Sequence, residues 1–215
     1  MEKKKTVRSE GTDKVLEYVK AIATALVLAL IIRTFIIQAF KIPSGSMIST
    51  LLIGDHLLVN KIIYGTPVDI PFTNVTVFHM PGFRTPRKDE IIVFKYPEDP
   101  TRDFIKRVVA VEGDTVQMIN KKLYINGKPV DEPFTQHTDD AIHSAQGDPR
   151  DNFGPYLVPK NKLFVMGDNR DQSYDSRFWG YVDVHQVLGK AIILYWSWDS
   201  DKSLPRLNRI GKLIN

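Results

Sequence analysis

Residues 41–47 read Lys-Ile-Pro-Ser-Gly-Ser-Met and directly follow an apolar segment, while most of the chain beyond them consists of short β-rich runs. Within this stretch, Ser46 lies between Gly45, which lets the backbone bend closely, and Met47, which can fill an apolar pocket. Such a setting can present a reactive hydroxyl, although an ordinary turn has the same composition. Because serine is a weak nucleophile at its own pKa, the reactive interpretation requires a base elsewhere in the chain.

The composition indicates a folded protein. A chain of 215 residues with 43% hydrophobic content can bury a core, and its length suits one domain with an appendage. The net charge of +4 is too small, and too evenly spread, to indicate nucleic-acid binding. Because the sequence has no cysteine, a disulfide framework, a thiolate nucleophile and a thiolate metal site are all excluded.

The N-terminal segment predicts a membrane anchor. Basic residues are frequent up to residue 20, and residues 21–32 are apolar on every face, whereas a soluble amphipathic helix keeps a polar stripe. The helix is long enough to span a bilayer if it starts near Val15 and if Glu17 and Lys20 reach the lipid surface. The positive-inside bias then predicts a cytoplasmic segment 1–14, an anchor 15–33 and an extracytoplasmic domain 34–215.

Two alternatives apply to the same segment. A cleaved signal peptide would need small residues at a cleavage site, and residues 33–40 contain no such pair. A buried helix of a soluble core is the other alternative, and the flanking charges argue against it.

The remainder of the chain predicts a mainly β fold, an antiparallel all-β catalytic body with a smaller inserted β lobe. Strands are expected at residues 35–42, 55–64, 90–96, 104–111, 115–119, 122–125, 162–166 and 190–198. Short strands separated by turn signals are typical of a closed or sandwich-like antiparallel body. Residues 131–159 are rich in Asp, Pro, Gly and His, so we interpret them as an excursion within an inserted subdomain that spans residues 116–160.

The strand expected at 104–111 supplies a candidate base. Strand alternation places Lys106 on the same face as Phe104 and Val108. A buried, unpaired ammonium is costly, and a lowered pKa leaves the amine neutral. A fall of about 3 units from about 10.4 would let Lys106 take the proton of Ser46 near neutral pH. The alternative is an edge-strand lysine whose stem covers apolar surface.

Histidine is a more common base in serine hydrolases. The five histidines are His56, His79, His137, His143 and His185, and none lies in a recognisable motif. Ser46 is also not part of a G-x-S-x-G elbow. A Ser-His-Asp triad stays open but has no specific support.

Residues 166–180 form a second dense motif, Met-Gly-Asp-Asn-Arg-Asp-Gln-Ser-Tyr-Asp-Ser-Arg-Phe-Trp-Gly. So many charged and amide side chains after a strand predict a loop held by its own hydrogen bonds, with Asp175 and Arg177 as a candidate ion pair. Calcium is the rival ligand, but Gln172 and Ser173 stand where an EF-hand needs an acidic or amide residue and a glycine. We therefore expect no metal site.

The anchor, the 43–47 motif, the run 103–107 with Gly113-Asp114, and the loop 167–177 together resemble the type I signal peptidase family in order and spacing. The resemblance covers essentially the whole chain. It implies an endopeptidase of the plasma (inner) membrane that removes signal peptides from exported preproteins without a cofactor. Some members have a second transmembrane helix, whereas this sequence has one apolar segment.

The resemblance also implies residue roles. Ser46 is the nucleophile that forms an acyl-enzyme, Lys106 is its general base, and Ser173 holds the Lys106 amine. The Ser44 hydroxyl joins the Ser46 backbone N–H in an oxyanion hole. The supporting residues are Asp168, Arg170, Asp175 and Arg177. The residues that match the shallow apolar pockets for small side chains at substrate positions −1 and −3 are Phe40, Ile42, Met47, Leu51, Leu57, Phe104 and Ile105, and each of them is also a plausible core residue.

Trp196 and Trp198 share one face of a predicted strand, near a basic tail whose charges are Lys202, Arg206, Arg209 and Lys212. We hypothesise that the two tryptophans rest the body on membrane lipid, with a place in the core as the alternative.

Two rival functions remain. Self-cleaving repressor proteases also use a Ser/Lys pair but carry a DNA-binding region, and a membrane-tethered β binding module would need no catalysis.

Overall fold

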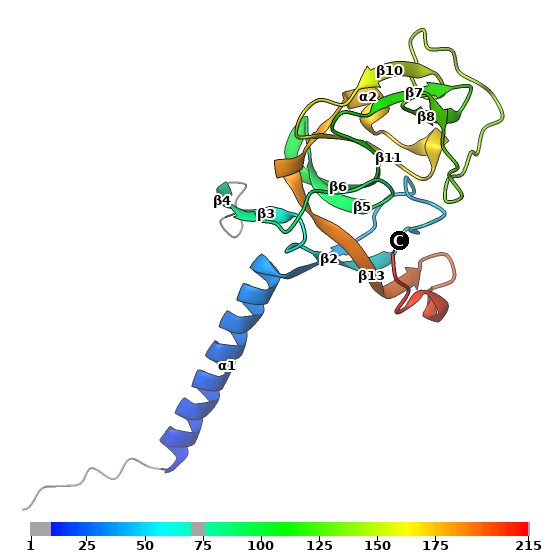
Figure 1. Ribbon diagram of the computed structural model, residues 1–215. Coiled ribbons are helices and arrows are strands. Elements are labelled where there is room, and N and C mark those ends of the chain that lie inside the picture. Colours follow the sequence, from blue (N-terminus) through cyan, green and yellow to red (C-terminus); the bar gives the residue numbers. More distant parts are fainter. Residues whose placement is uncertain (1–9, 70–75, 215) are drawn as a thin grey trace, which may run out of the picture.

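A long N-terminal helix stands apart from a body of antiparallel sheets (Figure 1). This computed structural model describes residues 10–69 and 76–214. The helices are α1 (Glu10–Phe35) and α2 (Ser176–Trp179), and the 3₁₀ turns are η1 (Arg170–Gln172), η2 (Val184–Gln186) and η3 (Leu207–Arg209). The predicted fold class, a mainly β protein after one N-terminal apolar helix, is confirmed.

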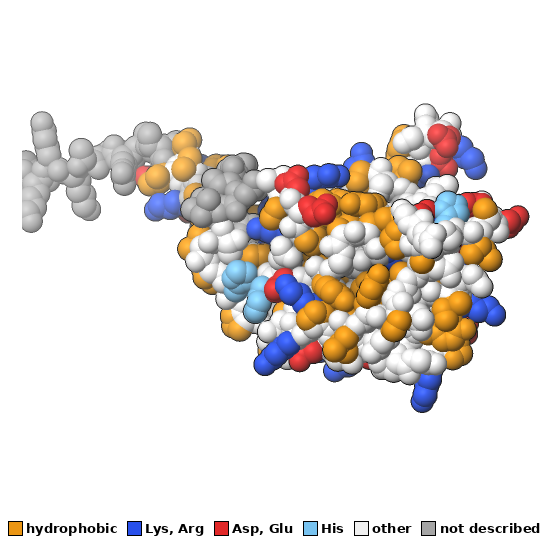
Figure 2. All heavy atoms as spheres, turned by 90° about the horizontal axis from the view of Figure 1, so that it is seen from above, with side chains coloured by type: hydrophobic (Ala, Val, Ile, Leu, Met, Phe, Trp, Pro, Cys, Tyr) orange, Lys and Arg blue, Asp and Glu red, His pale blue; other side chains and the backbone are white. Residues whose placement is uncertain are grey.

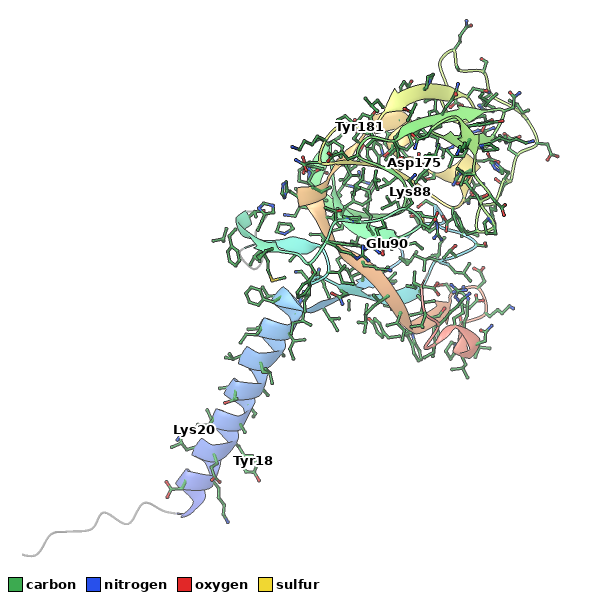
Figure 3. The ribbon with its side chains drawn as sticks, viewed as in Figure 1. Tyr18, Lys20, Lys88, Glu90, Asp175 and Tyr181 are labelled. Carbon is green, nitrogen blue, oxygen red and sulfur yellow. The ribbon has the colours of Figure 1, made fainter. Side chains whose placement is uncertain are left out.

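The helix α1 makes little contact with the body. Its residues from 13 to 33 are all exposed, although most of them are apolar. Within the described part of the chain it is the one helix long and apolar enough to cross a membrane, over Asp13–Phe35. The side chains of Tyr18 and Lys20 project from its N-terminal end (Figure 3). A helix that exposes apolar side chains on every face is a candidate membrane span.

The main sheet has antiparallel neighbours throughout. Its strands, in spatial order, are β1 (Ile37–Lys41), β2 (Asp55–Asn60), β13 (Val187–Asp199), β5 (Ile91–Tyr96), β6 (Asp99–Val111), β11 (Lys162–Met166) and β12 (Val182–Asp183), and β14 (Leu204–Pro205) pairs with β13. The order brings β6 and β11, which are far apart in sequence, side by side. Strand β6 carries Lys106, and β11 leads directly to the loop that begins at Gly167.

Strand β5 shows why this sheet is stable. Its alternate residues belong to two different hydrophobic clusters, Ile91 and Val93 to one and Ile92 and Phe94 to the other. All four side chains are buried. Burial of each such side chain contributes roughly 1.5–3 kcal/mol, so a strand covered on both faces is a rigid base for its neighbour β6.

A second, four-stranded sheet forms a smaller lobe. Its spatial order is β10 (Phe153–Leu157), β7 (Thr115–Ile119), β8 (Lys122–Ile125) and β9 (Lys128–Pro129). The excursion predicted at 131–159 supplies only the strand β10 to this sheet, and the other three strands precede the excursion. The lobe packs on the main sheet through a cluster that contains Val116, Met118 and Phe164.

The predicted strand positions are largely correct, and those at 115–119, 122–125 and 162–166 match the structure at both ends. The strand predicted at 55–64 is wrong beyond Asn60. The Asn60 side chain accepts hydrogen bonds from the backbone N–H groups of Ile62 and Ile63, at 2.9 and 3.3 Å, and this turns the chain.

The sequence analysis did not predict the hairpin of β3 (Gly65–Asp69) and β4 (Thr76–Pro81), which lies beside the body end of α1 (Figure 1). Pro67 pairs with His79 and Pro81 pairs with Gly65 in this hairpin. Proline is uncommon inside strands, so the two prolines made this part of the sequence look unlike a strand.

Candidate active site

The loop after β1 and the strand β6 bring Ser46 and Lys106 together. Nζ of Lys106 lies 2.7 Å from Oγ of Ser46, and the two residues are 4% and 8% exposed. The loop is fixed on both sides of the serine, because Ile42 and Met47 are buried in the core. The predicted base and nucleophile are therefore within hydrogen-bond distance.

The environment of Lys106 makes its amine easier to deprotonate than that of an exposed lysine. Burial lowers the pKa of the Lys106 amine to about 8, because a charged ammonium loses its hydration there. The negative charge of Asp175 acts to raise this pKa, and the positive charge of Arg177 acts to lower it. The amine is thus poised to exchange a proton close to neutral pH.

A cleft of about 460 Å³ lies in front of the Ser46–Lys106 pair. The residues that line it are Pro43, Ser44, Gly45, Ser46, Arg102, Asp103, Phe104, Ile105, Lys106, Gln172 and Tyr174. Among the described residues, those lining the cleft include no histidine. The sequence analysis missed Arg102, although strand alternation places it on the same face as Phe104 and Lys106.

The seven residues predicted for substrate binding fall into two groups. Phe104 and Ile105 line the cleft. The other five belong to or pack against the hydrophobic core under the nucleophile loop, and they are Phe40, Ile42, Met47, Leu51 and Leu57. They share this cluster with Ile105, which also lines the cleft, and their contact with substrate stays a prediction.

The predicted pair of Asp175 and Arg177 is fully buried behind the lysine. Nε of Arg177 donates to Oδ1 of Asp175 at 2.8 Å, and Nη2 donates to Oδ2 at 2.9 Å. Burial acts to raise the pKa of Asp175, but the charge and hydrogen bonds of Arg177 outweigh it and hold the pKa below its ordinary value. Asp175 also accepts from the backbone N–H of Gly167, so the pair ties α2 to the end of β11. Asp175 lies within the body, near β11 and α2 (Figure 3).

The two other supporting residues, Asp168 and Arg170, find partners outside their own loop. Asp168 accepts two hydrogen bonds from the buried Arg107, both of 2.8 Å. Arg170 pairs with Glu132 of the excursion. The sequence analysis missed Arg107 and Glu132 as partners, although the position of Arg107 next to Lys106, on the opposite face of β6, gives a signal.

The two remaining predicted serines differ in environment. Ser44 is exposed and lines the cleft. Ser173 is buried against Gly167, and its hydroxyl interacts with the Asp175 carboxylate, which helps to lower the pKa of that group, but makes no hydrogen bond to the Lys106 amine. Its predicted bond to the Lys106 amine is therefore absent from this geometry, and its role in catalysis stays a prediction.

Asn169 is a further site residue that the sequence analysis missed. Its side-chain Nδ2 donates to the carbonyl of Gly45, and its backbone N–H donates to the carbonyl of Ser46, both at 3.1 Å. Asn169 therefore bonds directly to the nucleophile loop. Nothing in the sequence distinguishes it from the other polar residues of its motif.

Known proteins are similar to this chain over most of its length. The family model described as signal peptidase, peptidase S26, matches residues 15–196. Signal peptidase I of Pseudomonas aeruginosa is 34% identical, over 91% of this chain and 78% of the relative. Signal peptidase I of Leptolyngbya laminosa is 36% identical, over 95% of this chain and 86% of the relative. Signal peptidase I of Aquifex aeolicus is 33% identical, over 78% of this chain and 79% of the relative.

Proposed function

The chain belongs to the signal peptidase family, peptidase S26, and we propose that it removes signal peptides from exported preproteins with Ser46 as nucleophile and Lys106 as general base. One observation carries the assignment of the two residues. The Lys106 amine and the Ser46 hydroxyl are 2.7 Å apart in a buried setting that lowers the pKa of the amine. This is the geometry that general-base activation of a hydroxyl requires.

The first half of the reaction forms an acyl-enzyme. Neutral Lys106 takes the hydroxyl proton while Oγ of Ser46 attacks the peptide carbonyl carbon. The negative oxygen of the tetrahedral intermediate is stabilised by the backbone N–H of Ser46 and the hydroxyl of Ser44. The Lys106 ammonium then protonates the leaving nitrogen, the C–N bond breaks, and the mature protein departs.

The second half restores the enzyme. Lys106 is neutral again and takes a proton from a water molecule, which attacks the ester carbonyl. The bond between Oγ and the acyl carbon breaks, the proton returns to Ser46, and the signal peptide leaves with a free carboxylate. We propose that Ser173, which lies beside Gly167 as the Ser46 carbonyl does, helps to hold the Lys106 amine.

The walls of the cleft suit small side chains before the scissile bond. Phe104 and Ile105 supply apolar walls, and Ile105 packs against the buried cluster that contains Ile42, Met47 and Leu57. We expect small residues at substrate positions −1 and −3 to fit this space, because a larger side chain would have to displace a packed core.

We further propose that α1 anchors the catalytic body at the membrane. Residues 1–14 would lie in the cytoplasm, residues 15–33 in the bilayer, and residues 34–215, with the subdomain 116–160, on the outer side. An anchored enzyme meets a membrane-held preprotein at a higher effective concentration than a free enzyme would.

The end of β13 is the proposed lipid contact of the body. Trp196 and Trp198 are 38% and 37% exposed, which favours a lipid contact over a place in the core. The basic tail contributes less charge than its sequence indicates, because Arg209 pairs with Asp55 and Arg206 pairs with Asp199. The face of the body that is turned away from α1 also carries apolar side chains between scattered charges, and it would point away from the bilayer (Figure 2). Deleting the anchor and replacing both tryptophans should abolish binding to liposomes, and unchanged binding would contradict a lipid contact.

Cleavage of a preprotein with an Ala-x-Ala site tests the proposed function. The intact protein should cleave it, and the variants Ser46→Ala and Lys106→Met should not. Ser49→Ala and Lys61→Met are matched controls, because Ser49 is a nearby exposed serine and Lys61 is another buried lysine. Both controls should keep activity.

The result also separates the rival functions. A membrane-tethered binding module would give no cleavage by any variant, including the intact protein. Equal cleavage by the intact protein, Ser46→Ala and Lys106→Met would show that other residues carry the chemistry.

A further inference from the structure

Asn169 holds two consecutive carbonyls of the nucleophile loop. The residue lies just after β11 and is 1% exposed. Its Nδ2 donates to the Gly45 carbonyl and its backbone N–H donates to the Ser46 carbonyl, each at 3.1 Å. Two bonds from one buried residue fix both the position and the rotation of the loop at the serine.

The bond to Gly45 has a consequence for the next N–H along the chain. The carbonyl of Gly45 and the N–H of Ser46 belong to one planar trans peptide group and point in opposite directions. A donor that holds the carbonyl on one side therefore aims the N–H to the other side. We infer that Asn169 is a positioning residue of the oxyanion hole, which keeps the Ser46 N–H directed at the negative oxygen.

This inference rests on the proposed function, in which the Ser46 N–H is an oxyanion donor. The positioning is needed because Gly45 has no Cβ and its backbone rotates more freely than that of other residues. A rotated Gly45–Ser46 peptide would present a carbonyl where the N–H is required. Within the described residues, the one other hydrogen bond to the Gly45 carbonyl comes from the Ile48 N–H at 3.2 Å, and because this donor lies in the same turn, it moves with that turn.

The excursion holds Asn169 in turn. The Gln136 N–H donates to the Asp168 carbonyl at 2.9 Å, and the Arg170 N–H donates to the Gln136 carbonyl at 3.1 Å. These bonds hold the residues on either side of Asn169 in place, and the ion pair of Glu132 with Arg170 adds to this restraint. The excursion therefore restrains Asn169, the residue that positions the oxyanion donor. The sequence of the excursion does not indicate this role.

The variants Asn169→Ala and Asn169→Asp test the inference in the full-length protein. Both lose the donor to Gly45, and Asp keeps the size of Asn while it places an oxygen against the carbonyl. We expect kcat to fall about 100-fold, similar to the loss of one oxyanion donor. The KM should change less than threefold, and in Asn169→Ala the midpoint of the pH–rate profile should not move, because this variant adds no charge near Lys106.

Paired inhibitors give a readout that a loss of stability would not reproduce. A peptide aldehyde forms an adduct with Ser46 that places a negative oxygen in the hole, whereas the matching peptide alcohol fills the same cleft without one. The aldehyde should bind about 100-fold more weakly to both variants. The affinity for the alcohol should stay within threefold of the intact protein.

Asn152→Ala is the matched control. Its Nδ2 also donates to a backbone carbonyl, that of His143 at 2.7 Å, but it lies in the smaller lobe. This variant should keep both kcat and aldehyde affinity. Unchanged kcat in Asn169→Ala, or equal weakening of aldehyde and alcohol, would overturn the inference. If Ser46→Ala is inactive in the same assay, only the inference fails, whereas an active Ser46→Ala removes the proposed function as well.

Discussion

Gly167 illustrates how closely the backbone packs around the candidate nucleophile. A Cβ at this position would lie 2.4 Å from the carbonyl oxygen of Ser46 and 2.3 Å from Oγ of Ser173. Such distances are well inside van der Waals contact, so even one methyl group must push the two serines away. Glycine is required here because of space.

We predict that Gly167→Ala loses activity by about 100-fold, the effect of a displacement of about 1 Å at a catalytic group. Gly127→Ala is the control. A Cβ there has no neighbour within 4 Å, and the positive φ of 74° should cost the alanine about 1–2 kcal/mol of stability without displacing a site residue. Preprotein cleavage and thermal unfolding of both variants check the prediction, which fails if Gly167→Ala keeps activity.

The lowered pKa of Lys106 predicts the pH dependence of cleavage. The amine accepts a proton only when neutral, so activity should rise with pH through about 8. Below that value kcat/KM should fall about tenfold per pH unit, because the protonated fraction dominates. A profile that is flat from pH 6 to 9, or one with a midpoint near 10, would show that Lys106 is not the base.

At the scale of elements, the pair of Asp175 and Arg177 joins α2 to β11 behind the lysine. We predict that Arg177→Met destabilises the protein by about 3–5 kcal/mol, because the Asp175 carboxylate stays buried without its partner. The double variant Asp175→Asn, Arg177→Met should recover part of this loss. Urea unfolding at pH 7 measures both, and a double variant less stable than Arg177→Met would contradict the explanation.

The regular strands were predictable because their apolar pattern and turn residues are local. The positions of β7, β8 and β11 follow directly from such patterns. The hairpin of β3 and β4 was not predictable in this way, since prolines occupy paired positions in it. Asn60 likewise ended a run of apolar residues through a side-chain bond that composition does not reveal.

At the scale of the whole molecule, the orientation of the chain is a testable proposal. The sequence lacks cysteine, so a single introduced thiol can be labelled without background. In intact cells with a permeable outer envelope, Ser144→Cys should react with a membrane-impermeant maleimide, because Ser144 is exposed on the body. Ser9→Cys should react only after the membrane is disrupted. The reverse pattern would overturn the proposed orientation.

The candidate site was only partly predictable from the sequence. Ser46 and Lys106 lie in recognisable motifs, and the 2.7 Å between them agrees with that expectation. The contacts of Asn169 with Gly45, and of Arg170 with Glu132, depend on how distant segments meet. Such tertiary contacts leave no periodic signal in one sequence, so they had to come from the structure.

The junction between α1 and the body is short. The helix ends at Phe35 and β1 begins at Ile37, and the chain reaches Ser46 five residues after β1 ends at Lys41. Because this junction is so short, the proposed anchor would hold the cleft at a fixed height above the lipid headgroups. The enzyme would then select its scissile bond by the distance of that bond from the membrane surface. It would cleave only where the emerging chain presents the bond at that height.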